Sequence, residues 1–418
     1  MNGRIEVKAS GRTLILSAPV LLTLYALFQD TLILYASLLA LLLSLCALLS
    51  AVKRVRWLAE NLRVKPESIE LKLTAGDTGI VKARIEAPKP VKIHVKHPLS
   101  FCTVKPQSIT ANNEFTFEFT PNLAGSYSSD KLDIESDIAI GLFKAKVSLP
   151  FKTEVAVIPR VIPAVVRALE LIGSTASPGG SMYEYPLIHK IGRGTEYAET
   201  REYTPGDEFR RIDWKATARL QKLMIKQFHE EVGGEVNLIF DLKSAGPVSM
   251  DATAAEFLNL ATALSAGNIP YRITIVDEEN RIETLRFEDW RQTLLAAVRY
   301  ALASVKVDYT YLYDIIGPQS SGELMLLTKI ASGEILFDGV QKDQGWMDAV
   351  AVTCLIGDLT WLIDIWNEAV KHGGRLIVHT PSKVWLDSPS LEEAYMDYQR
   401  QARILKMLRK RGVEVEVY

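Results

Sequence analysis

Two apolar runs without any charged residue, close to the N-terminus, constrain this chain most. They are "TLILSAPVLLTLYALF", residues 13–28, and "TLILYASLLALLLSLCALLSAV", residues 31–52. The second run has 22 residues, and about 20 are enough for an α-helix to cross roughly 30 Å of hydrocarbon. The first run has 16 residues and contains Pro19, but only two residues separate it from the second. The runs predict a hairpin of two transmembrane helices within residues 1–60.

Charged residues around this hairpin predict its orientation. The turn carries one acid and no base, whereas bases lie before the first run and after the second. By the positive-inside rule both ends face the cytoplasm, which predicts a two-pass protein of the cell membrane with cytoplasmic soluble domains. A cleaved signal peptide is the alternative interpretation of the first run, but no small-residue cleavage site follows it. The flanking bases are Arg4, Lys8, Arg12, Lys53, Arg54, Arg56 and Arg63.

Residues 61–160 alternate apolar and polar side chains in short runs that Gly, Pro, Asn or Asp separate. Examples are "IELKLT", "IVKARIEA", "VKIHV", "EFTFEFT", "KLDIES" and "FKAKVSL". Successive side chains of a strand point to opposite faces, so each run predicts a strand with one buried face. Many short strands of this kind are typical of an antiparallel β-sandwich.

Residues 235–418 follow a different pattern. "EVNLIFDL", residues 235–242, is almost continuously apolar, as strands covered on both faces are. Apolar strands then alternate with amphipathic helices, which predicts a doubly wound α/β domain with a mainly parallel sheet. Ligands of such folds bind at the carboxyl ends of the strands, so residues 241–244 and 357–360 are candidate site positions. Residues 161–234 are expected to connect the two domains.

Net charge and cysteine spacing give no sign of a polyanion partner, a disulfide framework or a metal knuckle. The formal net charge is −2, so the whole-chain balance favours neither a nucleic acid nor an anionic lipid as partner. Binding to either would need a local basic patch. Cys46, Cys102 and Cys354 lie far apart in the sequence, which is neither a disulfide framework nor a metal knuckle.

The connecting segment contains the stretch "REYTPGDEFRRIDWKATAR", residues 201–219, called the signature block below. Pro205 and Gly206 suit the central positions of a tight turn, and Asp213 is placed to cap a helix that begins at "WKATAR". Residues 193–231 carry eight bases and eight acids, a balance that favours internal pairing over binding to a polyanion.

This stretch, followed by "KQFHEE" and "VNLIFDLKS", resembles the family catalogued as domain of unknown function 58. The resemblance implies a membrane hairpin, a β-sandwich, the signature block and a von Willebrand factor A-like domain, in that order. It also implies association with AAA+ ATPases of the MoxR type, hence an adaptor or scaffold with no established catalytic activity. The family signature, and candidate partner-binding set, is Arg201, Tyr203, Pro205, Gly206, Asp207, Arg210, Arg211, Asp213, Trp214 and Arg219.

Two main interpretations of the signature block stay open. In the first it is a clasp against the α/β sheet, with Trp214 as a buried apolar anchor and arginines paired to carboxylates. In the second it is a surface that recognises a partner. We expect a division of roles, with Trp214 and Asp213 structural and at least one of Arg210 and Arg211 exposed. A catalytic or nucleic-acid site is a third interpretation, but no Ser, Cys or His nucleophile stands there beside a base, so no catalytic residue is predicted.

The resemblance to von Willebrand A-like domains also implies a Mg²⁺ site built from an Asp-x-Ser-x-Ser loop, a Thr and a second Asp. Asp241 and, by position, Asp358 match that pattern, but Lys243 and Ala245 stand at the two hydroxyl positions. No loop between residues 303 and 342 offers a convincing Thr. We expect no metal, with Lys243 pairing to Asp241 or Asp358 in its place; Mg²⁺ bound by the two aspartates is the alternative.

The sequence as a whole therefore predicts a non-catalytic, membrane-anchored interaction or scaffold protein, without cofactor, that presents its α/β domain to a MoxR-type ATPase. A hydrolase that uses the carboxyl-end mouth of the α/β sheet is one alternative. A metal-dependent adhesion module is another, and it would need an intact metal loop and the opposite topology.

Overall fold

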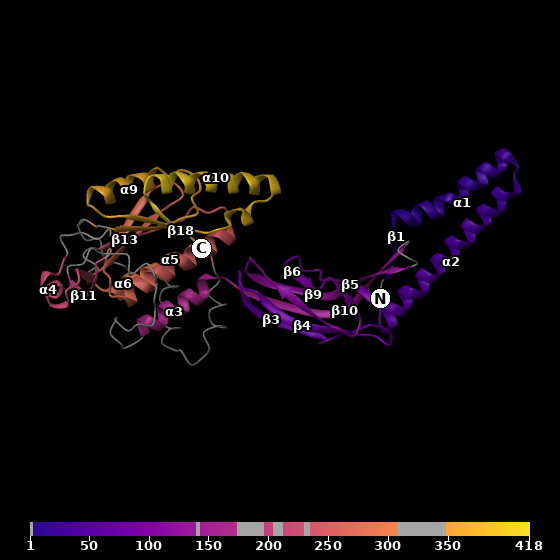
Figure 1. Ribbon diagram of the computed structural model, residues 1–418, viewed down its shortest axis with the longest axis horizontal. Helices are drawn as coiled ribbons and strands as arrows, with labels where there is room; N and C mark the ends of the chain where they lie inside the picture. The colour runs from indigo at the N-terminus through magenta and orange to yellow at the C-terminus, as the bar shows by residue number, and fades with distance from the viewer. Residues whose placement is uncertain are drawn as a thin grey trace. The chain divides into compact units, whose positions relative to one another are not determined.

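The computed structural model describes residues 3–138, 143–173, 196–203, 212–229, 235–306, 346 and 348–418. The chain divides into two compact units, Met1–Pro159 and Arg160–Tyr418 (Figure 1). Each unit has a hydrophobic core of its own.

Two long helices open the first unit, α1 (Ala9–Phe28) and α2 (Thr31–Asn61). Both are long and apolar enough to cross a membrane, judged by length and composition, so the two predicted apolar helices are confirmed. The carboxylate of Asp30 caps α2 by accepting a hydrogen bond of 2.9 Å from the Leu32 N–H. Many of their large apolar side chains are exposed, as side chains that face lipid would be.

Helix α2 is longer than its apolar run, which ends at Val52. It continues to Asn61, and Leu58 on this extension is fully buried in the core of the β-sheets, as is Ala51 at the end of the run. Packing against the sheets therefore stabilises the helical residues that follow Val52.

Two β-sheets make up the rest of the first unit. One has the strand order β1-β10-β9-β5-β7, with β3 beside β10, and the other has the order β2-β4-β8-β6. Neighbouring strands are antiparallel except β3 and β10, which are parallel. All six alternating runs quoted above form strands. The strands are β1 (Gly3–Val7), β2 (Arg63–Lys65), β3 (Ser68–Thr74), β4 (Gly79–Glu86), β5 (Lys92–Lys96), β6 (Cys102–Lys105), β7 (Ser108–Thr110), β8 (Glu114–Phe119), β9 (Gly125–Ile138) and β10 (Phe143–Ile158).

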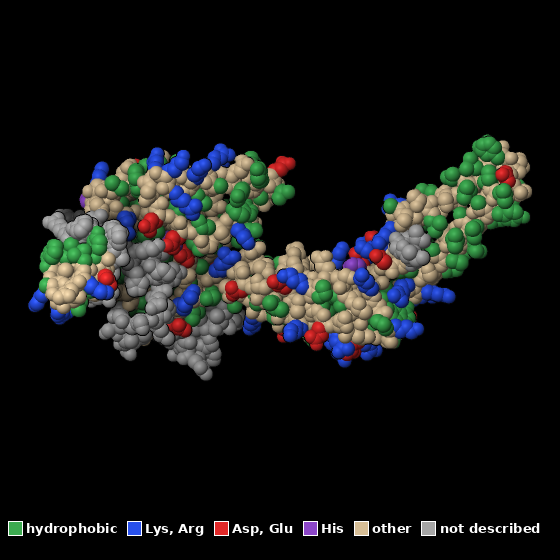
Figure 2. All heavy atoms as spheres, in the orientation of Figure 1, with side chains coloured by type: hydrophobic (Ala, Val, Ile, Leu, Met, Phe, Trp, Pro, Cys, Tyr) green, Lys and Arg blue, Asp and Glu red, His purple; other side chains and the backbone are tan. Residues whose placement is uncertain are grey.

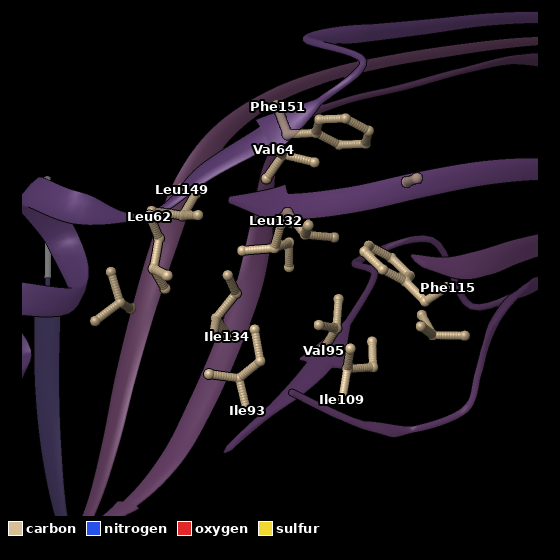
Figure 3. Close-up of a cluster of buried hydrophobic side chains, with 14 of the residues drawn as sticks. Leu62, Val64, Ile93, Val95, Ile109, Phe115, Leu132, Ile134, Leu149 and Phe151 are labelled. Carbon is tan, nitrogen blue, oxygen red and sulfur yellow. The ribbon is translucent and has the colours of Figure 1, made fainter. Parts of the chain in front are cut away.

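Both sheets contribute side chains to one core (Figure 3). Phe115 comes from the second sheet, and Ile93, Leu132 and Ile134 come from the first, each at most 2% exposed. The period-two alternation of the sequence thus places one face of each sheet in this core.

The N-terminal strand β1 is a feature that the sequence analysis missed. It pairs with β10 in antiparallel register, from Gly3 opposite Val147 to Val7 opposite Phe143. A five-residue segment has no pattern of its own that distinguishes it from a tail, because its structure depends on the free edge of β10. Since β1 precedes α1 and β2 follows α2, both ends of the hairpin join the same β unit.

A six-stranded sheet with the order β15-β14-β13-β16-β17-β18 is the centre of the second unit. All neighbours are parallel except β14 and β15. Every residue of β13 is buried, as predicted for a strand covered on both faces. The strands are β13 (Val236–Asp241), β14 (Tyr271–Val276), β15 (Ile282–Leu285), β16 (Asp348–Val352), β17 (Leu376–Thr380) and β18 (Glu414–Val417).

Helices lie on both sides of this sheet (Figure 1). On one side α3 (Val161–Gly173), α5 (Pro247–Ala266) and α6 (Trp290–Val305) pack together. On the other, α9 (Thr360–Lys371) and α10 (Leu391–Lys410) share a core with the sheet. The alternation of strands and helices that the sequence predicted is therefore present.

A smaller element carries the signature block. Strands β11 (Glu196–Glu202) and β12 (Met224–His229) form an antiparallel pair, and helix α4 (Trp214–Leu220) lies between them in the chain.

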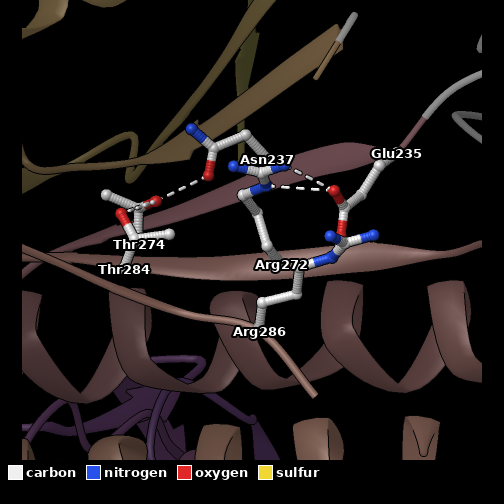
Figure 4. Close-up of polar contacts among 6 residues, drawn as sticks. All are labelled: Glu235, Asn237, Arg272, Thr274, Thr284 and Arg286. Atoms are coloured by element: carbon white, nitrogen blue, oxygen red, sulfur yellow. Dashed lines mark hydrogen bonds and ion pairs between the residues drawn. The ribbon is translucent and has the colours of Figure 1, made fainter. Parts of the chain in front are cut away.

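A row of polar side chains crosses the start of the sheet from β13 to β15 (Figure 4). Glu235 forms ion pairs with Arg272 at 2.5 Å and with Arg286 at 2.8 Å, and the Arg272 side chain is only 4% exposed. Beside them Thr274 donates a hydrogen bond of 2.6 Å to Asn237. At this end of the sheet Glu235, before β13, is thus joined to β14 and to the residue after β15 by two ion pairs, and the one with Arg272 is nearly buried.

Candidate functional site

The first candidate site lies at the carboxyl ends of β13 and β16. These neighbouring parallel strands are the point from which the chain winds outward in both directions, where ligands bind in open α/β sheets. Asp241 ends β13 and Thr353 follows β16, and both are fully buried. Asp241, a predicted site residue, therefore contacts Thr353, which was not among the predicted site residues.

Both carboxylate oxygens of Asp241 accept hydrogen bonds from the protein itself. The Thr353 hydroxyl donates to Oδ2 at 2.7 Å, and the Lys243 N–H donates to Oδ1 at 3.1 Å. Burial raises the pKa of Asp241 to about 6, although these two hydrogen bonds and the Lys243 charge lower it. Asp241 therefore faces inward, toward donors of its own chain.

Lys243 connects three loops at this edge of the sheet. Its ammonium group donates to the backbone carbonyl of Asp358 at 3.1 Å and to the side-chain oxygen of Asn280. Asn280, in the turn between β14 and β15, donates in turn to Asp358 Oδ2 at 3.1 Å. The hydrogen bonds of the ammonium thus go to a carbonyl and an amide, and its charge acts on both aspartates through space.

Asp358 lies at the start of α9. Its carboxylate accepts hydrogen bonds of 3.0 Å from both the N–H and the hydroxyl of Thr360. The bond from the Thr360 N–H is the largest of several causes that hold the pKa of Asp358 below its usual range. Asp358 precedes the N-cap residue Leu359, and its carboxylate accepts a hydrogen bond from the N–H of the first residue of the helix.

The N-terminus of α5, beside the Asp241 loop, is also occupied by the chain itself. Asp387, at the end of the short 3₁₀ helix η3 (Val384–Asp387), accepts hydrogen bonds from the N–H groups of Val248 at 2.9 Å and Ser249 at 2.8 Å. A Cβ at Gly246 would come within 2.8 Å of Asp387, so glycine permits this approach. A helix N-terminus is otherwise a ready site for an anion.

The donor set at this edge does not suit a divalent cation. Hard ions need free carboxylate and hydroxyl oxygens, whereas both oxygens of Asp241 are engaged and an ammonium group contacts the Asp358 loop. Among the described residues no group of three or more His, Cys, Asp or Glu side chains is placed to hold a metal. The expectation that no metal binds stays a prediction, and its test is given below.

Sequence reasoning missed Thr353, Asn280 and Asp387. Thr353 directly follows the apolar run of β16, which is the only sequence signal that pointed to it. Asn280 and Asp387 reach the site from positions that are distant in the chain, so no local pattern could identify them.

The second candidate site is the signature block, of which the structure describes a part. Pro205, Gly206, Asp207, Arg210 and Arg211 lie outside the described residues, as does the side chain of Arg201. The exposure of at least one of Arg210 and Arg211 therefore stays a prediction.

Asp213 caps α4 as predicted. Its Oδ1 accepts hydrogen bonds from the N–H groups of Lys215 at 3.1 Å and Ala216 at 3.0 Å, and the bond from Ala216 is the largest cause that lowers the pKa of Asp213. The backbone around the helix is tied to the strand that follows. The Asp213 N–H donates to the Met224 carbonyl at 2.9 Å, and the Met224 N–H donates to the Thr217 hydroxyl at 3.0 Å. Helix α4 thus has a defined position on β12.

The prediction that Trp214 is a buried anchor is wrong, since its side chain is 68% exposed. Trp214 is the first residue of α4, and this short helix buries Ala216 instead, next to the buried Ile212 and Ile225. Figure 2 shows hydrophobic side chains gathered over α4. The exposed apolar residues here are Trp214, Leu220 at 50% and Leu223 at 36%, called the α4 patch below, with the exposed Arg219 beside them.

Tyr203, the remaining signature residue with a described side chain, is half-buried at the end of β11. Its N–H donates a hydrogen bond of 2.8 Å to the Leu223 carbonyl, which joins the strand to the loop after α4. The signature block therefore has a structural part, made by Asp213 and this backbone, and an exposed apolar part.

These features define a class of protein: two helices apolar enough to span a membrane, two β-sheets around one core, and an α/β unit whose sheet-edge site is filled by its own side chains. Residues 199–306 match the family model described as "Protein of unknown function DUF58", which supports the resemblance drawn from the signature block. The matched range contains α4 and the Asp241 loop. No curated protein matches the chain.

Several solved structures show weak similarity. A protein of unknown function from Porphyromonas gingivalis W83 is 13% identical over 23% of this chain and 48% of its own, with a TM-score of 0.19. The BIgI domain of beta protein from S. agalactiae, bound to CEACAM1, is 13% identical over 23% of this chain and 96% of its own, with a TM-score of 0.15. A Bacteroides ovatus GH5 xyloglucanase is 10% identical over 76% of this chain and 65% of its own, with a TM-score of 0.19. This chain thus spans about half the length of the first of these. We infer neither a fold nor a function from similarities at these TM-scores.

Proposed function

We propose that the protein is a non-catalytic, membrane-anchored interaction protein that binds a cytoplasmic partner through the α4 patch, and that this partner is a MoxR-type AAA+ ATPase. The observation that carries the proposal is the 68% exposure of Trp214 on a helix whose backbone is held by hydrogen bonds. Trp is enriched among the residues that dominate binding energy in protein interfaces. The choice of ATPase follows from the family resemblance alone.

The sheet-edge site supports the non-catalytic part of the proposal. Asp241 is engaged by Thr353 and Lys243, and the N-terminus of α5 is capped by Asp387, so the two places where this kind of fold holds ligands are filled internally. The strand order, with β15 as the antiparallel edge, fits a von Willebrand A-like domain that has kept its fold without its metal. The first unit fits a β-sandwich, since its two sheets face one core.

The membrane part of the proposal rests on α1 and α2. Both are apolar enough to span, and β1 and β2 attach the two ends of this hairpin to one β unit. Bases flank both outer ends whereas the turn carries only Asp30, which favours a cytoplasmic location for both units.

Capture of the ATPase by the full-length protein, purified in a neutral detergent, tests the proposal. Trp214→Ala should lower capture by about 30-fold or more, because an interface hot spot contributes about 2 kcal/mol or more. Its stability should change by less than about 0.5 kcal/mol, as for other exposed sites. Tyr395→Ala is the matched control, since Tyr395 is an aromatic residue with 61% exposure on α10. Equal capture by wild type and Trp214→Ala would refute the α4 patch as the contact.

A further inference from the structure

The base of the membrane hairpin carries a local concentration of bases. Figure 2 shows Lys and Arg side chains gathered where the apolar helices meet the β-sheets. A local patch of this kind is what binding to an anionic surface requires in a chain whose net charge is −2. The bases contributed by the hairpin and by β1 are Arg4, Lys8, Arg12, Lys53, Arg54 and Arg56.

Acidic side chains neutralise only some of the bases in this region. Lys8 forms an ion pair with Asp137 at 2.7 Å, and Lys146 on the neighbouring β10 forms one with Glu6 at 2.6 Å. Among the described residues no ion pair joins an acid to Arg4, Arg12, Lys53, Arg54 or Arg56, called the hairpin bases below. The patch therefore has an excess of positive charge.

The acid nearest in sequence does not cancel this excess. Glu60 lies one turn after Arg56 on α2, and both are exposed, but no ion pair joins them. Arg54 instead places its guanidinium carbon 5.3 Å from the ring centre of Trp57. Trp is enriched at membrane–water interfaces, and an arginine over its ring keeps its charge available to a second, anionic group.

The hairpin bases on α1 and α2 lie at positions that match the surface of a bilayer. The apolar run of α2 has 22 residues and is therefore about 33 Å long, close to the thickness of the hydrocarbon core. Lys53 follows it directly, and Arg12 precedes the apolar run of α1 at the same end of the hairpin. The charged heads of these residues therefore lie at the depth of the lipid headgroups.

We infer that the hairpin bases form a binding surface for anionic phospholipid headgroups, which enriches such lipids around the protein. Clusters of Lys and Arg directly beside a membrane span attract anionic lipids, by about fivefold per base. Zwitterionic headgroups carry their own cation and gain little from the same surface. This inference rests on the membrane anchoring proposed above, but it does not involve the α4 patch or the ATPase.

Quenching of Trp57 by brominated lipids tests the inference in the full-length protein. Trp57 is the one tryptophan of the first unit, and the other six of the seven lie in the second. The protein is reconstituted into phosphatidylcholine vesicles that contain a small, equal share of either brominated phosphatidylglycerol or brominated phosphatidylcholine. The same measurement on Trp57→Phe reports the other six tryptophans, and subtracting its fluorescence from that of the wild type gives the quenching of Trp57 alone.

We expect brominated phosphatidylglycerol to quench Trp57 more strongly, and added salt to reduce the difference. Lys53→Gln/Arg56→Gln should lower the preference for phosphatidylglycerol by about 5- to 25-fold. The matched control is Lys82→Gln/Arg84→Gln, which removes the same two residue types from exposed positions of β4. It should leave the preference unchanged.

Two results would overturn the inference. One is equal quenching of wild-type Trp57 by the two lipids, and the other is the same loss of preference in both double variants. Neither result depends on ATPase capture, so failure of this inference is distinguishable from failure of the proposed function.

Discussion

Asp241→Asn should remove a pH dependence of stability that comes from one buried carboxyl. Burial raises the pKa of Asp241 from its ordinary value of 3.8 to about 6 in the folded protein. The folded state therefore holds this proton more tightly than the unfolded state. The contribution to the free energy of unfolding is largest below about pH 4 and is lost as the pH rises through about 6.

The magnitude follows from the difference between the two pKa values. A difference of about 2 corresponds to about 3 kcal/mol, at 1.36 kcal/mol for each tenfold change in the proton equilibrium. Asn cannot ionise, so the variant should lack this loss. The Thr353 hydroxyl and the Lys243 N–H then contact an amide, which shifts the stability of the variant by an amount that does not vary with pH.

Urea unfolding of the full-length protein in neutral detergent, at several pH values between about 4 and 7, measures the effect. Tryptophan fluorescence follows the second unit, because it contains six of the seven tryptophans. Asp358→Asn is the control. The pKa of Asp358 is lowered by the Thr360 N–H, so its contribution has the opposite sign and is lost as the pH falls. The reasoning is refuted if wild type and Asp241→Asn lose stability equally between these pH values.

Three other predictions concern the metal, the polar row and the topology. Mg²⁺ or Mn²⁺ should not raise the melting temperature, because Lys243 contacts the Asp358 loop and the carboxylate of Asp241 is hydrogen-bonded to Thr353. A metal that bound the folded state at a hundred times its Kd would stabilise it by about 2.7 kcal/mol. A saturable rise in melting temperature that Asp241→Ala abolishes would contradict this prediction. Glu235→Ala should lower the free energy of unfolding by about 3 to 5 kcal/mol, because it removes the carboxylate that forms an ion pair with the buried Arg272. The control Glu202→Ala removes an exposed ion pair with Lys222 and should lower the free energy of unfolding by less than about 1 kcal/mol. Similar losses in the two variants would show that burial does not make the loss of the Glu235 carboxylate more costly. A reporter that is active only outside the cytoplasm, fused after Tyr418, should stay silent, since the outer ends of the hairpin are basic; a strong signal would reverse the topology.

Elements with a strong local pattern were predictable from the sequence. The apolar helices and β13 are continuously apolar, and the sandwich strands alternate apolar and polar residues, so the residues themselves specify the element. The cap at Asp213 was predictable for the same reason, because a cap and its donors lie within three residues.

Features that depend on a distant partner were not predictable. Strand β1 exists because β10 offers it a free edge, and α2 extends past Val52 because Leu58 has a core to enter. Thr353, Asn280 and Asp387 reach the sheet edge from three different loops. The exposure of Trp214 depends on which side of α4 packs on β12, and a seven-residue helix has too few turns to indicate this.

The central claim, that the α4 patch is the contact surface for a cytoplasmic partner, is tested most directly by crosslinking inside the cell. A photo-crosslinking amino acid in place of the exposed Trp214 should capture one partner, a MoxR-type AAA+ ATPase, in a covalent product identified by mass spectrometry. The same amino acid in place of the exposed Tyr395 should not capture it. Absence of any ATPase product at position 214, or equal capture from both positions, would contradict the account.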